Sequence, residues 1–285
     1  MGKLSLVGKV THVPTMIMSE SPGRVYGTRQ HAIDGHREIG RRCRELGVDT
    51  IVVVDTHWVV NAGYHINANH RFKGVFTSNE FPQFIQNLEY DYQGNAALGD
   101  LIAEKAMAKD VHTLSHQIDS LELEYGTLVP MRYMNEDAHF KVVSIGGWCT
   151  VHSHESSRLV GEAIREAIEA SDSNVALLAS GSLSHKIWQN ELYEANNGTF
   201  TISSEFNRQM DIRVMDLWKN GEIATFLKML PDYAKHCSGE GHMHDTAMMF
   251  GALGWDGYTG KGEQISEYFP SSGTGQVNFV FPVQS

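Results

Sequence analysis

Three kinds of feature are scarce or missing in this chain of 285 residues. Its three cysteines, Cys43, Cys149 and Cys237, form no closely spaced pair, which argues against a disulfide framework and favours reduced thiols. No apolar run approaches the roughly 20 residues of a membrane helix, and the N-terminus lacks the pattern of a signal peptide. We therefore expect a cytoplasmic protein with no membrane partner.

Positive charge is also in short supply. The chain has 23 Lys and Arg residues against 34 Asp and Glu residues, which gives a formal net charge of −11 at pH 7. Nucleic acids and anionic membranes reward basic patches, so this balance argues against both as partners. With 41% hydrophobic residues and no repeat, low-complexity tract or long linker, the chain is expected to form a single domain over residues 1–285.

Histidine, by contrast, is abundant, and three histidines follow strand-like segments. Residues 51–54 are four β-branched residues in a row, a pattern typical of a strand that is buried on both faces in a parallel sheet. His57 comes just after this strand. Two further strand-like segments lead in the same way to His12 and to His185. Open α/β sheets bind their ligands at the carboxyl ends of strands, so these three side chains are candidates for one site.

Hydrophobic periodicity and turn residues predict strands that alternate with helices. The fold class is therefore α/β, with a central, mostly parallel sheet that helices flank and a site at the carboxyl ends of the strands. Segment 59–95 is interpreted as a small lid or an edge extension, and residues 112–126 as a polar loop. Strands are predicted at 4–11, 51–54, 63–67, 74–76, 141–145, 175–185 and 277–281; helices are predicted at 31–46, 94–109 and 156–170, twice within 203–230, and from a start at 239–245 to 253.

One combination of these residues suits a ferrous ion. An Fe(II) ion that must bind both a substrate and dioxygen needs open coordination positions, and two imidazoles with one carboxylate leave three. His12 and His57 are the natural imidazole pair. Glu240 is the preferred carboxylate, because it lies between Gly239 and Gly241, where the backbone can bend, and precedes a helix, whose dipole favours negative charge.

Other assignments remain open on the residues alone. His242, His244 and Asp245 lie in the same loop as Glu240 and are alternative ligands. A single buried histidine is more often a hydrogen-bonded core residue than a metal ligand. The pair His112 and His116 has i, i+4 spacing, but no Glu follows the first His as a zinc protease motif requires. A zinc hydrolase that uses the histidines at the strand ends is also an alternative.

Several common catalytic motifs are absent. The sequence contains no G-x-S-x-G motif, no phosphate-binding loop with its lysine, and no dinucleotide-binding glycine fingerprint. Ser184 and His185 are adjacent, but adjacency alone does not indicate a catalytic triad. These absences leave a metal centre as the chemistry best supported by the residues.

Four stretches of this sequence resemble the class III extradiol ring-cleaving dioxygenases, and the likeness covers nearly the whole chain. The four stretches are Thr11–Pro14, Asp55–Trp58, Ser180–His185 and Gly239–Thr246; further matching stretches are Ala32–His36, Leu123–Asn135 and Ser271–Asn278.

The resemblance implies a mechanism and its participants. It implies a non-haem Fe(II) ion held by His12, His57 and a Glu, here Glu240, and it implies His185 as the acid–base residue. The substrates would be O2 and a catechol, which we expect to be 3,4-dihydroxyphenylacetate, and the product a muconic semialdehyde. We expect a homo-oligomer. The alternatives are 2-aminophenol as substrate, or a catalytically silent subunit, which should lack the ligand set.

The chain departs from the family pattern at one position. Many relatives have Asp-His-Gly where this chain has Glu124-Tyr125-Gly126, so a second catalytic histidine is missing. Tyr125 or His116 is the expected replacement as proton donor. Arg132 and Arg24 are candidates for binding the acetate group, although arginines are most often found on the surface.

Overall fold

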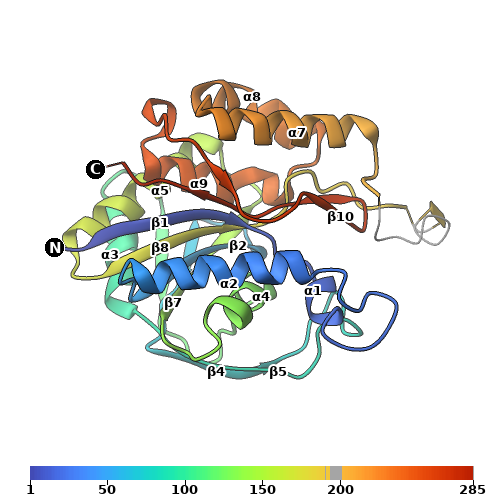
Figure 1. The fold of residues 1–285 in the computed structure, drawn as a ribbon. Helices are drawn as coiled ribbons and strands as arrows, with labels where there is room; N and C mark the ends of the chain where they lie inside the picture. Colours follow the sequence, from blue (N-terminus) through green and yellow to red (C-terminus); the bar gives the residue numbers. More distant parts are fainter. Residues whose placement is uncertain (190, 193–200, 285) are drawn as a thin grey trace.

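The computed structural model describes residues 1–189, 191–192 and 201–284, and an eight-stranded mixed sheet forms its centre (Figure 1). Four parallel strands in the middle of the sheet carry the candidate site, which confirms the predicted fold class. In spatial order they are β7 (Lys141–Cys149), β2 (Thr50–Val60), β8 (Asn174–Ser180) and β1 (Lys3–Val10); β3 (Tyr64–Asn67) and β6 (Thr113–His116) extend the sheet beyond β7, and β12 (Phe279–Phe281) and β9 (Glu263–Gln264) extend it beyond β1.

Helices cover both faces of this sheet. One face packs against α2 (Gln30–Glu45) and α4 (Tyr125–Met134). The opposite face packs against α5 (His154–Ala170) and α9 (His244–Leu253), with α3 (Ala96–Met107) beside α5. Outside α9 lie α7 (Glu205–Asn220) and α8 (Ile223–His236), far from α2 in Figure 1. Each face of the sheet is therefore closed to water.

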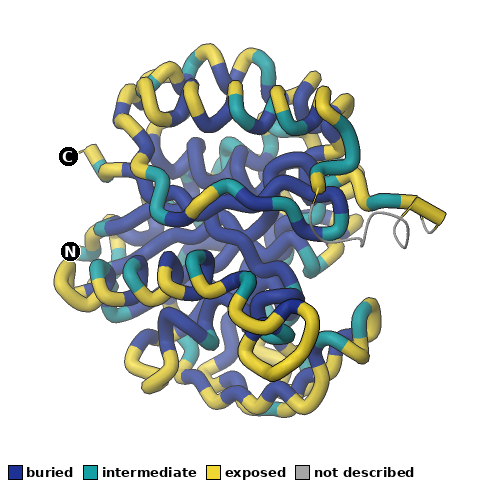
Figure 2. Tube along the Cα trace, turned by 45° about the vertical axis from the view of Figure 1, so that its right-hand side comes forward, coloured by how far each residue is buried: buried dark blue, intermediate teal, exposed yellow. Residues whose placement is uncertain are grey.

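Strand β2 shows why the continuous apolar run folds in this way. Ile51 and Val53 point into the core beneath α2 and α4, whereas Val52 and Val54 point into the core beneath α5 and α9. All four side chains are fully buried. Because side chains alternate along a strand, only a run without polar breaks can serve two cores at once. Figure 2 shows this buried interior with its exposed residues on the outer turns.

The predicted helix bounds agree well with the structure. The segments 31–46, 94–109 and 156–170 correspond to α2, α3 and α5 within two residues at each end. The two helices expected within 203–230 are α7 and α8. Gly47 has φ +69° just after α2, the left-handed conformation expected for a residue that ends a helix.

Several short elements were not predicted. Within segment 59–95, the strand predicted at 74–76 is the end of β4 (Arg71–Phe76), which pairs with the unpredicted β5 (Leu88–Gln93) in a separate antiparallel hairpin. The predicted loop at 112–126 contains β6 and the start of α4, whose Pro130 and uniformly apolar surface hide its helical period. The remaining short elements are α1 (Thr15–Met18), the 3₁₀ turns η1 (Glu240–Met243) and η2 (Trp255–Gly257), and the small hairpin of β10 (Phe269–Ser271) and β11 (Thr274–Gln276).

Two predicted strand ends are wrong in detail. His57 lies within β2 and not beyond it, because the strand continues to Val60 after an irregular stretch. Strand β8 ends at Ser180, so His185 follows a short loop and does not end the strand itself. In both places a polar residue interrupts regular pairing at the site and redirects the chain.

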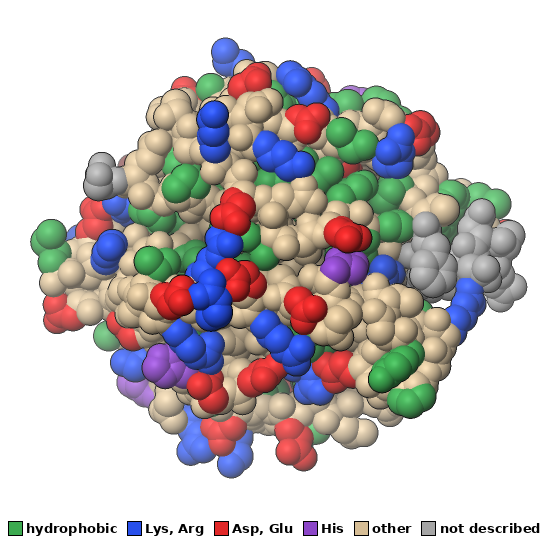
Figure 3. Space-filling model, viewed as in Figure 1, with side chains coloured by type: hydrophobic (Ala, Val, Ile, Leu, Met, Phe, Trp, Pro, Cys, Tyr) green, Lys and Arg blue, Asp and Glu red, His purple; other side chains and the backbone are tan. Residues whose placement is uncertain are grey.

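The outer surface is charged and mixed in sign. Figure 3 shows basic and acidic side chains interspersed on the face that carries α2, where Arg41 pairs with Glu38 and Glu45. Exposed pairs of this kind contribute little to stability, because water and salt screen them. Within the described residues, no helix combines the length and the apolar character that a membrane span requires.

Candidate active site

His12, His57 and Glu240 converge on one point at the carboxyl edge of the sheet. His12 follows β1, His57 belongs to the irregular part of β2, and Glu240 begins η1. One nitrogen of each ring and one carboxylate oxygen all lie within 4.8 Å of one another. His12 Nε2 is 3.0 Å and His57 Nε2 is 3.4 Å from Glu240 Oε1. Among the described residues this is the one such group of three possible ligands.

Hydrogen bonds determine which nitrogen of His12 faces Glu240. His12 Nδ1 lies 2.9 Å from Ser180 Oγ, and this hydroxyl donates to the carbonyl of Gly126 at 2.5 Å. Since Ser180 uses its only proton there, it must accept the proton of Nδ1. When Nδ1 carries the only ring proton, the lone pair of Nε2 points toward the carboxylate oxygen 3.0 Å away, which is the arrangement that a metal ion bound by both atoms would use.

A local distortion of β2 places His57. Pairing with β7 is regular up to Asp55 and resumes only at Val59, so the strand bulges over the residues between. Asp55 fixes the bulge: its Oδ1 accepts the N–H of His57 at 2.8 Å and its Oδ2 accepts from Thr127 Oγ1 at 2.7 Å. Gly126 permits this approach, because a Cβ atom there would lie 2.0 Å from Asp55 Oδ1.

Glu240 is held from several directions. It is 2% exposed, and Gly241 next to it adopts φ +55°, a left-handed conformation that favours glycine. Thr56 Oγ1 lies 2.7 Å from Glu240 Oε1, and the N–H of Ser182 donates to Oε2. His185 Nδ1 lies 3.3 Å from Oε2. The ion pairs of this carboxylate are thus all with histidines.

The electrostatics of the group favour a bound cation. Burial alone raises the pKa of Glu240, but the neighbouring His185 and His12 lower it well below its ordinary value. Burial lowers the pKa of His57, yet its hydrogen bonds with Glu240 and Glu80 outweigh burial and raise it to about 9. Both shifts mean that the site attracts positive charge. Two imidazoles and one carboxylate fit a ferrous ion and leave coordination positions free for other molecules.

A small cavity of about 50 Å³ adjoins the three candidate ligands. His185 and Tyr125 both line it, as do Phe81 and Phe84 from the loop between β4 and β5. The ring of Tyr125 lies 3.8 Å from that of His57 between centroids, and its hydroxyl donates to Glu80 Oε2 at 2.9 Å. Burial and the Glu80 carboxylate raise the pKa of Tyr125, so its hydroxyl stays protonated.

The structure places the other candidate residues elsewhere. His116 lies on β6, the edge strand, where its Nε2 is 2.7 Å from His65 Nδ1, and it does not line this cavity. Asp245 pairs with the buried Lys9, and His244 Nδ1 is 2.8 Å from Ser157 Oγ. His242 lines a neighbouring cleft. Asp245 and His244 are therefore engaged in other contacts, and none of the three lines the cavity beside His12 and His57.

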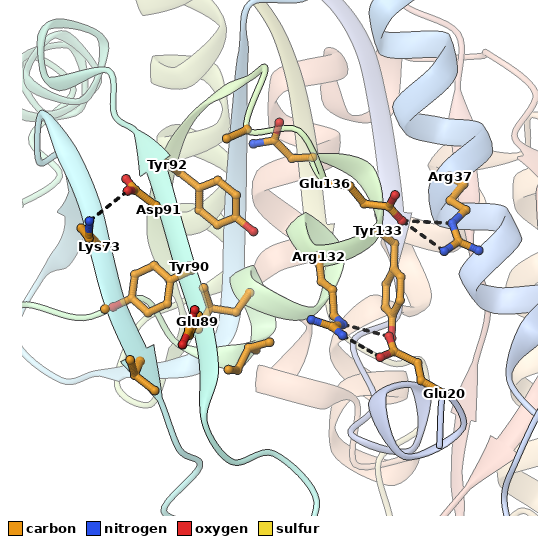
Figure 4. Close-up of a pocket in the computed structure, with 16 residues that line it drawn as sticks. Glu20, Arg37, Lys73, Glu89, Tyr90, Asp91, Tyr92, Arg132, Tyr133 and Glu136 are labelled. Atoms are coloured by element: carbon orange, nitrogen blue, oxygen red, sulfur yellow. Dashed lines mark hydrogen bonds and ion pairs between the residues drawn. The ribbon is translucent and has the colours of Figure 1, made fainter. Parts of the chain in front are cut away.

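Neither arginine predicted to bind the substrate lines the cavity. Arg132 lies in a separate cleft of about 800 Å³ between β5 and α4, where its side chain forms an ion pair with Glu20 (Figure 4). Arg24 is exposed in the loop after α1. Arg29, which the sequence analysis did not select, is 3% exposed and donates from Nε to Thr15 Oγ1 at 3.0 Å. Thr15 lines the cavity, so Arg29 lies directly behind its wall.

Some of the missed residues had a detectable signal. Asp55 and Thr56 immediately follow the buried run of β2, where a polar residue at a strand end could have been selected together with His57. Glu80 and Arg29 had no such signal, since both belong to loops whose path depends on the whole fold.

Comparison with known proteins agrees with the resemblance. Residues 7–282 match the family model described as the catalytic LigB subunit of aromatic ring-opening dioxygenase. A 3,4-dihydroxyphenylacetate 2,3-dioxygenase of Escherichia coli is 57% identical over 261 residues, which cover 92% of this chain and 94% of that protein. A 2-aminophenol 1,6-dioxygenase beta subunit of a Pseudomonas species is 22% identical over 240 residues, which cover 80% and 78%.

A solved structure supports the fold independently. The crystal structure of an uncharacterized protein from Escherichia coli K12 has a TM-score of 0.64 and 14% sequence identity, and the match covers 97% of this chain and 99% of that one. At this identity the likeness shows the fold alone. The family match over nearly the full length and the close relative both confirm the predicted family: the chain belongs to the LigB family of aromatic ring-opening dioxygenases.

Proposed function

We propose that this chain is an Fe(II)-dependent extradiol dioxygenase that opens the ring of 3,4-dihydroxyphenylacetate with O2 to give a muconic semialdehyde. One observation carries the proposal: His12, His57 and Glu240 bring three ligand atoms within 4.8 Å of one another, in a chain 57% identical to a 3,4-dihydroxyphenylacetate 2,3-dioxygenase.

His12, His57 and Glu240 would hold the iron on one side. When bound, Fe(II) supplies open positions for a catecholate and for dioxygen and a redox path between them. The protein residues then have two tasks, which are to orient the substrate and to move its protons. Ser180 contributes by fixing the orientation of the His12 imidazole, and Asp55 by fixing the backbone that carries His57.

His185 is the general base in this proposal. Its side chain is 21% exposed and faces the cavity, and its Nδ1 is 2.8 Å from Ser182 Oγ. An imidazole can both accept and donate a proton, which suits the removal of a catechol hydroxyl proton and its later return to a leaving oxygen. Tyr125, whose hydroxyl is protonated and lines the same cavity, is the second proton donor in place of the missing histidine. His116 has no part in the proposal because it does not line the cavity.

One part of the cavity wall suits a substrate with a carboxylate. The hydroxyls of Thr15, Ser271 and Thr274 belong to residues that line this wall. Behind them, Arg29 also donates to the carbonyl of Pro270 at 3.0 Å, and burial lowers its pKa to about 10. A guanidinium of that pKa stays charged at neutral pH. It would stabilise an acetate group bound through the hydroxyls, a role first expected of Arg132 or Arg24.

Access to the cavity requires movement. Ligand sites for small molecules usually enclose roughly 300–1,000 Å³, more than this cavity of about 50 Å³ offers. The loop that carries Glu80, Phe81 and Phe84 must therefore move outward when a catechol enters. When it returns, the two aromatic rings would pack on the substrate and exclude water. In this proposal the loop between β4 and β5 is the part of segment 59–95 that acts as the lid.

Two further parts of the proposal concern the setting of the enzyme. All three cysteines are free and buried, which fits the reducing cytoplasm. We also propose that the chain works as a homo-oligomer; the 2-aminophenol 1,6-dioxygenase relative is named as a beta subunit. Sedimentation velocity would give the assembly state directly.

The decisive test is oxygen uptake by anaerobically iron-loaded protein with a panel of substrates. We expect fast uptake and a yellow ring-fission product with 3,4-dihydroxyphenylacetate, slower uptake with 4-methylcatechol, and little with 2-aminophenol. If 2-aminophenol were the best substrate, the proposed substrate would be wrong. Hydrolytic activity with zinc and no oxygen uptake with iron would instead support the zinc hydrolase. No activity of either kind would leave a catalytically silent subunit.

A further inference from the structure

A carboxylate with no cationic partner is buried near His185 but outside the cavity. Asp211, on α7, is fully buried, and none of the ion pairs in the described part of the chain includes it. It accepts four hydrogen bonds. Oδ1 accepts from Ser184 N–H at 3.2 Å and from the hydroxyl of Tyr233 at 2.6 Å; Oδ2 accepts from Ser184 Oγ at 2.8 Å and from the hydroxyl of Tyr268 at 2.6 Å.

This arrangement is costly for stability alone. Burial raises the pKa of Asp211 to about 6 even though all of these donors favour the ionised form. A buried charge without a counter-ion is rarely better for stability than an apolar side chain of similar size. The four donors come from three separate parts of the chain, and each oxygen joins Ser184 to one tyrosine. The Asp211 carboxylate therefore fixes the position of Ser184 and contributes little to the stability of the core.

The loop that Asp211 holds is the one that carries His185. Ser184 directly precedes His185 and forms an isolated antiparallel bridge with Gly239. The carbonyl of Leu183 accepts the N–H of Glu240 at 3.3 Å. The backbone of this loop thus touches both the proposed general base and the turn that carries the proposed carboxylate ligand.

A second residue of α7 holds the same region one helical turn earlier. Asn207 is 1% exposed, and its Nδ2 donates to the carbonyl of Cys237 at 3.3 Å. The N–H of His185 lies 3.0 Å from the carbonyl of Ser238 and 3.3 Å from that of Cys237. One polar face of α7 is therefore bonded to both backbone segments that fix His185.

We propose that Asp211 is a positioning residue for His185, which it holds at the working distance from the substrate through Ser184. The inference rests on the proposed function, because it takes His185 as the general base. It assigns Asp211 no contact with the substrate or with iron. Geometric errors of about 1 Å in a catalytic group can cost on the order of a hundredfold in rate, so the loss of this anchor should appear in turnover.

The first experiment compares Asp211→Asn with Asp216→Asn, an exposed aspartate on the same helix. Asn carries no charge and its amide nitrogen can only donate, so all four bonds lose their ionised acceptor, and the two groups that face the nitrogen must either accept from it or lose their bond. For Asp211→Asn with 3,4-dihydroxyphenylacetate we expect kcat to fall roughly tenfold to a hundredfold while KM and iron content stay within about twofold of the parent. Asp216→Asn should match the parent in all three quantities.

The second experiment measures how firmly the loop at residues 181–186 is held, and it does not depend on enzymatic activity. Hydrogen–deuterium exchange, followed by peptide mass spectrometry on the iron-free and iron-loaded protein, should show faster exchange in peptides covering residues 181–186 of Asp211→Asn. Peptides from β2 and α5 should exchange as in the parent. Ser184→Ala, which keeps its N–H bond to Asp211, should give smaller changes of the same kind, and it remains informative if Asp211→Asn does not fold.

The outcomes test the role of Asp211 separately from the proposed function of the enzyme. Parental kcat and parental exchange at 181–186 in Asp211→Asn, or in Ser184→Ala if only that variant folds, would overturn the inference. So would a loss of kcat that comes with lost iron or with faster exchange throughout the chain, since that result means a purely structural role. If the parent enzyme consumed no oxygen with any catechol, the proposed function would fail, and the exchange data would still decide whether Asp211 anchors the loop.

Discussion

Two histidine-rich regions lie on either side of Glu240, and they differ in almost every property except composition. The first is the candidate metal site, where His12 and His57 face the carboxylate. The second is an open cleft of about 740 Å³, whose lining also includes His185 and Glu240. The cleft is lined by His152, His154, His242 and His244.

The two regions have opposite effects on histidine. In the first, burial lowers the pKa of His57, but Glu240 and Glu80 raise it to about 9. In the second, burial and the neighbouring histidines lower the pKa of His244 to about 3. The cleft also uses its ring nitrogens for other bonds, such as that of His154 Nε2 with the carbonyl of His242 at 2.7 Å. A cluster of histidines thus attracts a metal only where a carboxylate and free lone pairs converge.

The largest expected effect tests whether metal binding belongs to the first region alone. His57→Ala removes one of the two imidazoles that face Glu240 Oε1, so we expect iron content to fall from about one equivalent to below a tenth, measured by atomic emission after anaerobic loading and desalting. The matched change in the cleft, His242→Ala, should leave iron at the parental level. Full iron content in His57→Ala would show that His57 is not a ligand.

The next effect separates binding from proton transfer at the border between the regions. His185→Phe removes the proposed base but none of the three ligands, so iron should remain and kcat should fall by roughly a hundredfold to ten-thousandfold, the usual contribution of general acid–base catalysis. Oxygen uptake together with iron content gives both numbers. Loss of iron in this variant would make His185 a ligand and not a base.

The comparison also explains what the sequence could predict. His12 and His57 were predictable because buried strands are recognisable from their composition, and parallel strands must deliver their carboxyl ends to one edge. Glu240 stood out among His242, His244 and Asp245 through its flanking glycines. Only the fold shows that His244 and Asp245 are engaged elsewhere and that His242 lines another cleft. The ring-cleavage reaction and the acid–base role of His185 were inferred from the family resemblance.

Other parts were not accessible from the sequence. Arg132 looked like a substrate cation, yet its partner Glu20 is far away in the sequence and invisible to a local pattern. Arg29 approaches the cavity only because the loop before α2 folds back on β10, where its guanidinium lies 4.8 Å from the ring of Phe269. Contacts between distant loops depend on packing and leave no periodic signal.

A smaller effect, on KM, tests whether only the first region contributes to binding of the substrate carboxylate. Arg29→Met keeps much of the side-chain volume but removes the charge behind Thr15, so we expect KM for 3,4-dihydroxyphenylacetate to rise roughly tenfold, equivalent to about 1.4 kcal/mol. KM for 4-methylcatechol should barely change. Lys235→Met, which removes a cation from the cleft, is the control and should change neither value. Equal rises for both substrates in Arg29→Met would mean a loss of structure and not of recognition.

The last effect concerns stability and not activity: it is a pH dependence of unfolding that originates in the cleft. The pKa of His244 is about 3 when folded and near 6.5 when unfolded, so below pH 6.5 the unfolded chain binds the proton more tightly and stability falls as the pH falls. Between pH 6.5 and 5 this one residue should cost about 1.5 kcal/mol. Between pH 6.5 and 5, the free energy of unfolding measured in urea should fall by about this amount more in the parent than in His244→Gln. Identical pH profiles would show that His244 is not held neutral.

The most direct measurement of the central claim is anomalous diffraction at the iron edge from crystals of the anaerobically loaded protein. The account predicts one strong peak per chain, within bonding distance of His12 Nε2, His57 Nε2 and a Glu240 oxygen, and no comparable peak among the histidines of the cleft. An iron peak in the cleft, or none beside Glu240, would contradict it.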